Sequence, residues 1–392
     1  MKFNTYSISE LIDEIAMGPF GSNIKVECFV DDGIPVLNGS NLNGFFLTED
    51  SFRYVTETKA DSLGRANAHR GDIVITHRGT LGQIVCIPET SKYDRYVISQ
   101  SQFRVKCNEK VLPEYLVYYF HTAIGQHKLL SNASQVGVPA LARASTTFQK
   151  IEVEIPDIKT QQKVVSVLNA IEAKINVNRS INENLEQQAK ALYQQMFIEN
   201  TCPDWIEGSL RDIADITMGQ SPSGSSFNED GIGTIFFQGR AEFSFRFPTI
   251  RLYTTEPKRM AYANDILMSV RAPVGDLNIA HTDCCIGRGL AAIHSKTNHQ
   301  SFVLYTMFSL RKQLDVFNGE GTVFGSINRN SLNDMPILIP SDETIEEFEK
   351  IVAPMDAAIR NNYDEICRLQ AVRDSLLPRL MSGELDVSSL DI

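Results

Sequence analysis

The stretch that decides the fold runs from Lys163 to Phe197, with the sequence KVVSVLNAIEAKINVNRSINENLEQQAKALYQQMF. Apolar residues recur along it in alternating steps of four and three, and no Pro or Gly interrupts them. The ten stripe positions are Val164, Leu168, Ile171, Ile175, Asn178, Asn182, Leu185, Ala189, Leu192 and Met196, and all but the two asparagines are apolar. This pattern is typical of a coiled-coil seam. At ~1.5 Å per residue the helix is roughly 50 Å long, so its stripe requires a partner.

A second stripe lies 184 residues further along the chain. Its positions are Phe348, Val352, Met355, Ile359, Asn362, Ile366, Leu369, Arg373, Leu376 and Leu380. The flanking sequences also correspond, since Ile155-Pro156 falls on Ile339-Pro340. The chain is therefore a tandem repeat of two units, each a globular block followed by a long helix. We expect the two helices to pair with each other, antiparallel, as the intramolecular partners.

The globular blocks repeat as well. The string GDIVITHRGTLG at 71–82 corresponds to NDILMSVRAPVG at 264–275, an offset of 193 residues. Met17-Gly18 corresponds to Met218-Gly219, and the segment 34–39 corresponds to 234–239. Because the offsets differ slightly, loop lengths differ while the framework is kept.

These repeats predict an α+β protein with pseudo-twofold symmetry. Two mixed α/β domains are joined by two long helices that pair as an antiparallel coiled coil. The predicted ranges are 1–156 for the first domain, 157–200 for the first helix, 201–340 for the second domain, 341–383 for the second helix and 384–392 for a tail.

Two details of the helices can be tested. Asn178 and Asn362 occupy the same repeat position, so we expect them to face each other near the middle of the seam, where they either set the register or lie at its solvated edge. Pro354 predicts a break, with a short helix from about Thr344, capped by the pattern Thr344–Glu347, before a kink and a long helix.

Composition restricts the class of protein. Hydrophobic residues make up 43% and charged residues 22%, as in ordinary globular proteins. There is no apolar run of ~20 residues and no signal pattern at the N-terminus, so no membrane association is expected. Seven scattered cysteines suit a reducing cytoplasm. The net charge is −11, but residues 341–392 alone hold 5 Lys and Arg against 12 Asp and Glu. Both globular blocks are near neutral and can carry local basic surfaces.

The sequence carries no recognisable catalytic machinery. There is no Asn/Asp-Pro-Pro-aromatic tetrapeptide of an adenine methyltransferase and no phosphate-binding Gly-x4-Gly-Lys-Ser/Thr motif. His281, Cys284, Cys285 and His294 lack the spacing of a zinc site, so buried structural thiols are the better interpretation and no metal is expected.

Two similar blocks on a stiff spacer suit a target that is read at two places, and double-stranded DNA is such a target. Arginine suits guanine edges or phosphates, and Asn or Gln suits adenine edges. The candidate DNA-contacting residues are Asn38, Ser40, Asn41, His77, Arg78, Thr80, Gln238, Arg240, Arg246 and Arg271. For each, a solvated or turn-capping role is the alternative. Arg78 and Arg271 are favoured because they match in the repeat, just after a strand.

With these motifs the chain resembles the specificity subunits of type I restriction–modification systems. The resemblance rests on the strings at 71–82 and 264–275, on Ile155-Pro156 and Gln161-Gln162-Lys163 before the first helix, and on LLPRLMSGEL at 376–385. It covers essentially the whole chain in the family's order of domains and helices. One departure is Ala272-Pro273 in place of Gly79-Thr80, which leaves the conformation of that loop open.

The resemblance implies a non-catalytic subunit in which each domain reads one half of a bipartite DNA site. The helix pair would set the spacer and dock two modification subunits, and restriction subunits would join in some systems. S-adenosylmethionine, ATP and Mg²⁺ would then bind to these other subunits and no cofactor to this chain. Two other hypotheses remain: a protein–protein scaffold without DNA binding, and a methyltransferase with an unrecognised active site.

Overall fold

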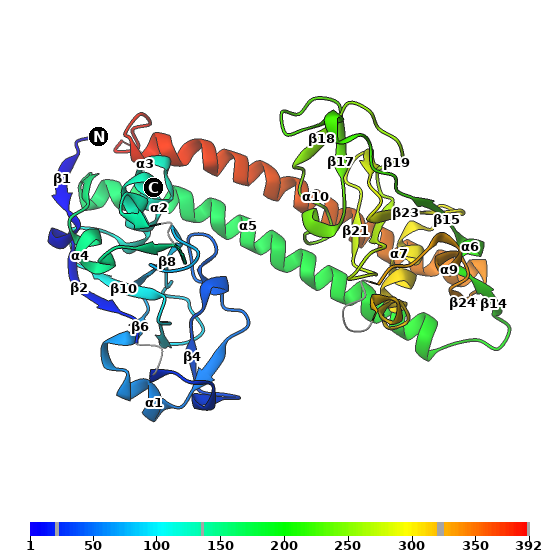
Figure 1. Cartoon of the computed structure of the whole chain (residues 1–392), viewed down its shortest axis with the longest axis horizontal. Coiled ribbons are helices and arrows are strands. Elements are labelled where there is room, and N and C mark those ends of the chain that lie inside the picture. The colour runs from blue at the N-terminus through cyan, green and yellow to red at the C-terminus, as the bar shows by residue number, and fades with distance from the viewer. Residues whose placement is uncertain (20–22, 135–136, 320–324, 390–392) are drawn as a thin grey trace. The chain divides into compact units, whose positions relative to one another are not determined.

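Two compact units make up the chain, and each contains part of both long helices. The computed structural model describes residues 1–19, 23–134, 137–319 and 325–389. The first unit combines Met1–Asn176 with Ile366–Ile392, and the second is Val177–Glu365 (Figure 1). The unit boundary therefore crosses both helices, whereas the predicted ranges separate the helices from the domains.

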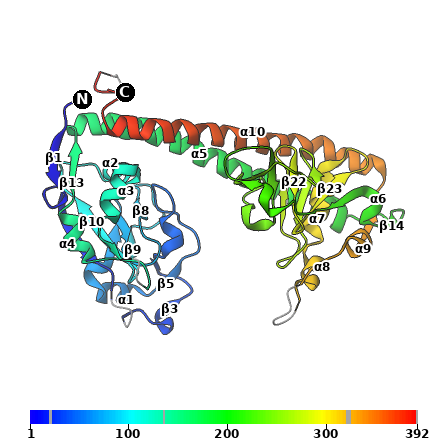
Figure 2. The ribbon, with the colours of Figure 1, turned by 45° about the horizontal axis from the view of Figure 1, so that its top comes forward.

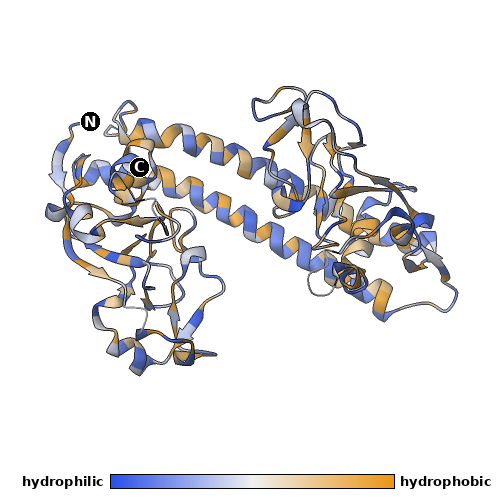
Figure 3. Ribbon diagram, in the orientation of Figure 1, coloured by the Kyte–Doolittle hydropathy of each residue, from blue (hydrophilic) through white to orange (hydrophobic). Residues whose placement is uncertain are grey.

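The long helices are α5 (Ile158–Tyr193) and α10 (Asp342–Met381). A π-helical turn at Gln194–Glu199 continues α5. Within each unit the two helices lie side by side (Figure 1 and Figure 2), and hydrophobic and hydrophilic residues alternate along both of them (Figure 3). This is the appearance of an amphipathic pair with a shared apolar stripe.

Hydrogen bonds across the pair show its direction. In the second unit, Asn178 Nδ2 donates to Glu365 Oε2 at 2.7 Å. One turn later, Asn182 Nδ2 donates to the carbonyl oxygen of Ile359 at 3.2 Å. Residue numbers fall on α10 as they rise on α5, so the helices run antiparallel and the predicted fold class is confirmed.

The predicted seam residues lie on the facing sides of the helices. Six are buried: Leu168, Ile175, Asn178, Val352, Ile359 and Ile366. Six are half-buried: Ile171, Leu185, Leu192, Asn362, Leu369 and Leu376. The stripe therefore packs along its whole length, without a fully exposed position.

The predicted contact between Asn178 and Asn362 is wrong. Asn178 binds Glu365, and Asn362 Nδ2 donates instead to Asn182 Oδ1 at 2.8 Å. Asn178 and Asn182 are only 1% and 2% exposed and Asn362 is half-buried, so Asn178 does not lie at a solvated edge. The register is set one helical turn away from the predicted one because each buried amide needs a hydrogen-bonding partner on the opposite helix.

The predicted break at Pro354 is also wrong, because α10 is continuous from Asp342 to Met381. Pro354 lies on the exposed side of the helix, where water can satisfy the carbonyl group that loses its donor. Phe348 and Val352, six and two residues before it, are fully buried and keep the helix packed. The cap is Ser341, whose Oγ lies 3.4 Å from the amide nitrogen of Thr344, so Thr344 is inside the helix instead of capping it.

The first domain consists of short strands and helices. Its strands are β1 (Asn4–Ser7), β2 (Ile12–Met17), β3 (Phe29–Val30), β4 (Ile34–Val36), β5 (Arg53–Val55), β6 (Asn67–His69), β7 (Ile73–Thr76), β8 (Ile84–Cys86), β9 (Arg95–Val97), β10 (Gln102–Cys107), β11 (Ala133–Ser134), β12 (Ala140–Leu141) and β13 (Glu152–Ile155). Its helices are α1 (Glu57–Ser62), α2 (Pro113–His121), α3 (Ala123–Leu130) and α4 (Ala144–Gln149).

The second domain follows the same plan. Its strands are β14 (Ile206–Ser209), β15 (Ala214–Met218), β16 (Phe227–Asn228), β17 (Thr234–Phe237), β18 (Leu252–Thr254), β19 (Met260–Ala261), β20 (Ile266–Ser269), β21 (Leu277–Ile279), β22 (Cys284–Ile286), β23 (Leu290–Ser295) and β24 (Pro336–Ile339). Its helices are α6 (Leu210–Ile213), α7 (Gln300–Ser309), α8 (Arg311–Asp315) and α9 (Arg329–Asn333).

Three sheets have the same strand order in both domains. The four-stranded sheets are β2-β10-β7-β8 and β15-β23-β20-β21, and the five-stranded sheets are β3-β5-β4-β9-β6 and β16-β18-β17-β22-β19. A two-stranded ladder joins the first strand of each domain to its last strand, β1 to β13 and β14 to β24. The repeat in the sequence is thus a repeat of topology, and residues can be matched by strand register.

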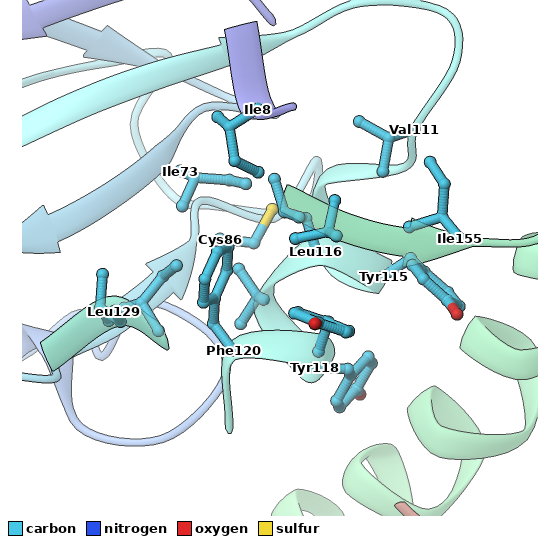
Figure 4. Packing of buried hydrophobic residues seen from close by; sticks show 14 of the residues in the cluster. Ile8, Ile73, Cys86, Val111, Tyr115, Leu116, Tyr118, Phe120, Leu129 and Ile155 are labelled. Atoms are coloured by element: carbon cyan, nitrogen blue, oxygen red, sulfur yellow. The ribbon is translucent and has the colours of Figure 1, made fainter. Parts of the chain in front are cut away.

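The core of the first unit connects a sheet to the long helices. Ile73 and Cys86 from the four-stranded sheet pack with Leu116 and Phe120 of α2 (Figure 4). The same cluster includes residues from both long helices: Val164, Val165, Leu168, Leu377, Leu380 and Met381. The first domain is therefore held to its part of the helix pair by one continuous core.

A carboxylate at one repeat position of each long helix, buried for Glu172 and half-buried for Asp356, meets an arginine. Glu172 and Asp356 are separated by the repeat offset of 184 residues. In the first unit, Nη1 of Arg373 on α10 lies 2.7 Å from Glu172 Oε1, and its guanidinium lies over the ring of Phe45. In the second unit, Nη2 of Arg246 lies 3.0 Å from Asp356 Oδ1.

Replacing Leu168 by Ala tests the packing between α5 and the first domain. Leu168 is fully buried, so we expect the first unit to lose ~2–5 kcal/mol of unfolding free energy through the cavity that remains. Denaturant unfolding measures this loss. Ser166→Ala, at an exposed position of the same helix, is the control and should change stability by no more than ~0.5 kcal/mol. Equal effects of the two substitutions would contradict the packing described.

Candidate nucleic-acid interface

Arg78 and Arg271 occupy equivalent places, two residues beyond the ends of strands β7 and β20. Each forms an isolated antiparallel bridge, Arg78 with Ala140 and Arg271 with Ser326. Both side chains are exposed, and within the described residues neither makes a hydrogen bond or an ion pair. A guanidinium placed in this way is free to bind an external acceptor such as a phosphate or a base edge.

The turn after each arginine ends on a glycine with a positive φ. Gly82 has φ +89° and Gly275 has φ +88°, a conformation in which L side chains are strained. In the second turn the Ala272–Pro273 peptide bond is cis. The two turns therefore begin and end alike, and they differ in between.

A side chain at the end of each turn holds the neighbouring loop in place. In the first domain, Gln83 Nε2 donates to the Gly39 carbonyl oxygen at 2.9 Å and to Asn43 Oδ1 at 3.2 Å. In the second domain, Asp276 is at the matching position and forms an ion pair with Arg240. The loops 38–43 and 238–243 thus lie beside the arginine turns.

A third segment in each domain lies beside the arginine turn and the neighbouring loop. The carbonyl oxygen of Ser101 accepts from the amide of His77 at 2.8 Å, and that of Gly289 accepts from the amide of Val270 at 2.9 Å. The turns 99–101 and 287–289 therefore lie next to Arg78 and Arg271. We call the first-domain edge Asn38, Arg78, Thr80 and Gln100, and the second-domain edge Gln238, Arg271 and Arg288.

The other first-domain candidates have local roles. Asn38 Oδ1 accepts from the amide of Ser40 at 2.8 Å and also from its hydroxyl, so these two residues cap the turn that follows strand β4. Thr80 is exposed. His77 is half-buried, with Nε2 3.2 Å from the Gln100 carbonyl oxygen, and burial lowers the pKa of its imidazole. His77 is therefore neutral at pH 7 and supports the edge without adding charge.

Two candidates are not available to DNA. Asn41 is fully buried, and its Nδ2 donates to the carbonyl oxygens of Thr48 and Asp50 at 3.0 and 2.7 Å, so it closes its own loop. The side chain of Arg246 is 2% exposed. We therefore remove both residues from the set of DNA contacts. The sequence could not separate them from the others because loop residues of the same type lie both inside and outside.

Arg246 instead holds the second domain on the helix pair. Its Nε lies 2.8 Å from Glu186 Oε2 on α5, and its Nη2 contacts Asp356 Oδ1 on α10. Nη2 also donates to the Tyr305 hydroxyl at 2.5 Å. Burial raises the pKa of the Asp356 carboxyl, while the charge of Arg246 acts in the opposite direction. One guanidinium therefore compensates two partly buried carboxylates.

The sequence analysis missed Gln100 and Arg288. Both are exposed at the middle of the short turn that precedes strand β10 or β23. A signal was present in the string Gly287-Arg288-Gly289, where an arginine between two glycines follows a buried strand. It could be noticed only by matching the two turns through their hydrogen bonds, because the surrounding sequences share little.

The cysteines that were considered as metal ligands are buried in strand β22. Burial raises the pKa of the Cys284 thiol to about 12, so it stays protonated. His294 Nδ1 lies 2.7 Å from Asp265 Oδ1, and His281 Nε2 lies 2.7 Å from Asp364 Oδ1. These histidines have carboxylate neighbours within the fold.

Comparison with known sequences decides the family. The pattern described as type I restriction modification DNA specificity domain matches twice, at residues 20–187 and 203–368. This chain belongs to that family. It is thus a DNA specificity subunit of a type I restriction–modification system, and the double match coincides with the internal repeat.

Curated relatives support the assignment of this specificity subunit. A Methanocaldococcus jannaschii protein assigned to the MjaX type I restriction enzyme as specificity subunit is 26% identical over 91% of this chain and 88% of its own length. The specificity subunit of the MjaIX enzyme from the same organism is 22% identical, covering 97% of this chain and 93% of its own length.

A solved structure shows the same fold. The S subunit of a type I restriction–modification system from M. genitalium matches with a TM-score of 0.61 at 13% identity, covering 97% of this chain and 96% of the other.

Among the described residues of the specificity subunit, no helix combines the length and the apolar character needed to cross a lipid bilayer.

Replacing Arg246 by Met tests its structural role. The change leaves Asp356 without its counter-ion and Glu186 with Lys190 alone, so we expect a loss of ~3–5 kcal/mol in the unfolding free energy of the second unit. The folded-state pKa of Asp356 should rise further above its unfolded value. Protonation then removes the uncompensated charge, so the loss should shrink as the pH falls from 7 towards about 5.

Denaturant unfolding at several pH values measures both effects. Arg240→Ala removes an exposed arginine of the same loop and should cost no more than ~1 kcal/mol at any of these pH values. A pH-independent loss in the Arg246 variant would contradict the role assigned to the two carboxylates.

Proposed function

We propose that each domain of this specificity subunit reads one half of a bipartite DNA sequence through the side chains of its edge. The observation that carries the proposal is the match between Arg78 and Arg271. Both side chains are exposed and both residues follow equivalent strands. Within the described residues, neither side chain has a hydrogen-bonding or ionic partner. Elsewhere in the chain, several arginines are engaged by carboxylates, as Arg104, Arg246 and Arg373 are.

The charge distribution supports the same proposal. Residues 341–392 hold 12 Asp and Glu against 5 Lys and Arg, so most of the net negative charge of the chain lies outside the two globular blocks of the sequence. An arginine side chain without an ionic partner on a near-neutral domain creates a local positive potential, which attracts the phosphates of a DNA duplex. Neighbouring amides on the same edge, from Asn38, Gln100 and Gln238, supply donors and acceptors suited to base edges.

The helix pair is proposed to set the distance between the two half-sites and to dock two modification subunits. Val177 and Ile181 are 51% and 42% exposed, one turn apart on the same face of α5. Exposed apolar residues on a helix whose opposite face is already paired are suited to a protein contact. Restriction subunits would join the same assembly where the system has them.

Catalysis is proposed to belong to the other subunits. S-adenosylmethionine for methylation, and ATP and Mg²⁺ for restriction, would bind there, and this chain would bind no cofactor. A scaffold without DNA affinity is the competing hypothesis. It predicts that a complex containing this chain does not retard a DNA duplex in a salt-dependent way.

Arg78→Ala and Arg271→Ala test the division of labour. Each substitution should weaken binding to the duplex that carries its own domain's half-site by ~10-fold or more, as expected for the loss of a hydrogen bond between charged groups, and leave binding to the other half-site unchanged. Binding of the complex with modification subunits to separate half-site duplexes measures this. Exposed Lys159→Ala on α5 is the control. Equal losses at both half-sites for either variant would contradict the proposal.

Matched deletions test the spacer. The hydrogen bonds in the second unit place Asn182 opposite Asn362 and Asn178 opposite Glu365. Deleting residues 173–179 together with residues 365–371 therefore removes one heptad from facing stretches. The pair should shorten by ~10 Å, which is about three base pairs at ~3.4 Å each, with both half-sites retained.

Sequencing of methylated adenines measures the spacer length in that variant. A chain with only the 173–179 deletion is the control, and it should lose activity because the register is broken. An unchanged spacer in the active double-deletion variant would contradict the spacer role.

A further inference from the structure

The turns that carry Gln100 and Arg288 occupy the same structural position. In both, the residue after the turn donates back to the residue that begins it, Gln102 to Ser99 at 3.1 Å and Leu290 to Gly287 at 3.0 Å. In both, the last turn residue accepts from the amide just before the edge arginine, at His77 or Val270. Gln100 and Arg288 are therefore matched through backbone geometry, although their side chains differ.

Both side chains point to the outside and are available. Gln100 and Arg288 are exposed, and within the described residues neither side chain has a hydrogen-bonding or ionic partner. Gln100 lines two adjoining hollows of about 460 and 600 Å³. Asn38 lines one hollow and Arg78 the other, so the amide of Gln100 lies between two other edge residues.

The backbone under these side chains is held tightly. A Cβ on Gly287 would lie 2.9 Å from the Cα of Gln238, and a Cβ on Gly289 would lie 2.8 Å from its carbonyl oxygen. In the first domain, a Cβ on Gly18 would lie 1.9 Å from the carbonyl oxygen of Ser99. These close approaches hold the second-domain turn against Gln238 and the first-domain turn against Gly18, and direct readout of a base requires a backbone held in this way.

We propose that Gln100 and Arg288 are specificity-determining residues, with Gln100 reading an adenine edge in one half-site and Arg288 a guanine edge in the other. Arginine binds guanine O6 and N7 with two hydrogen bonds, and glutamine binds adenine N6 and N7 in the same way. The inference rests on the proposed function, since it requires that each domain contacts one half-site.

The comparison of the two domains separates base contacts from phosphate contacts. Phosphates are the same in every DNA sequence, so a residue that binds them can be identical in both domains, as Arg78 and Arg271 are. A residue that reads bases must differ when the half-sites differ. Gln100 and Arg288 differ at a matched position beside those arginines, which is the pattern expected for base readout.

Three variants test the inference in the complex with modification subunits. Arg288→Gln should reduce discrimination for guanine at one position of the second half-site by ~5- to 150-fold and shift the preference towards adenine. Gln100→Arg should make the reverse change in the first half-site. Arg288→Lys keeps the charge but loses the planar fork, so it should relax specificity at the same position. The methylated motif and binding to substituted duplexes are the measurements.

Several outcomes would overturn the inference. In one outcome, Arg288→Lys keeps the wild-type motif, while Arg288→Gln weakens binding to all DNA sequences equally and lowers the slope of log affinity against log salt concentration by about 1. Arg288 would then be a phosphate contact. If the motif and the affinity did not change in any of the three variants, these turns would not contact DNA. Unfolding midpoints equal to the wild type show that the variants are folded.

Arg78→Ala and Arg271→Ala separate this failure from failure of the proposed function. If these two variants lose half-site binding while the Gln100 and Arg288 variants keep the wild-type motif, only the specificity assignment fails. If none of the five variants affects DNA binding, the proposed function fails with it.

Discussion

In each unit, one carboxylate of the helix pair is neutralised by an arginine, and this interaction has to be kept. Glu172 and Asp356 occupy the same position of the repeat, and each is neutralised by a guanidinium. The arginine comes from α10 in the first unit and from a loop in the second. Phe45 and Arg246 are equivalent by backbone, since their carbonyl oxygens accept from Cys86 and Ile279. Arg373 lies over the ring of Phe45, so it replaces Arg246 in function. An unpaired buried charge costs several kcal/mol, so the arginine can change element but cannot be lost.

In the edges, too, different residues make equivalent interactions in the two domains. Gln83 and Asp276 both hold the loop beside the arginine turn, the first through its amide and the second through an ion pair with Arg240. The backbone geometry of the edge is thereby kept while side chains around it diverge. Among the residues named as edges, Arg78 and Arg271 are the same in both domains. A framework of this kind allows new DNA sequences to be recognised without a new fold.

Periodicity predicted the helices, their pairing and the tandem repeat, because an apolar stripe of this length needs a partner whatever its neighbours are. The same reasoning failed for the contact between Asn178 and Asn362, because the seam period does not specify which turn of one helix faces which turn of the other. It failed at Pro354 because the cost of a proline depends on whether water reaches the freed carbonyl. For the edges, residue type suggested ten candidates but could not show that Asn41 and Arg246 are buried. Gln100 and Arg288 became apparent only when hydrogen bonds aligned two turns of unlike sequence.

Each domain begins and ends in one short ladder, β1 with β13 and β14 with β24. The ladder pairs Asn4 with Ile155 in the first domain and Ile206 with Ile339 in the second. The polypeptide thus enters and leaves a domain at neighbouring points. A domain can therefore be exchanged as one unit. Recombination between related genes at its two borders would place a complete new recognition domain on an unchanged pair of helices. One such exchange would change the recognised DNA sequence at once, whereas point mutations would have to alter an edge residue by residue.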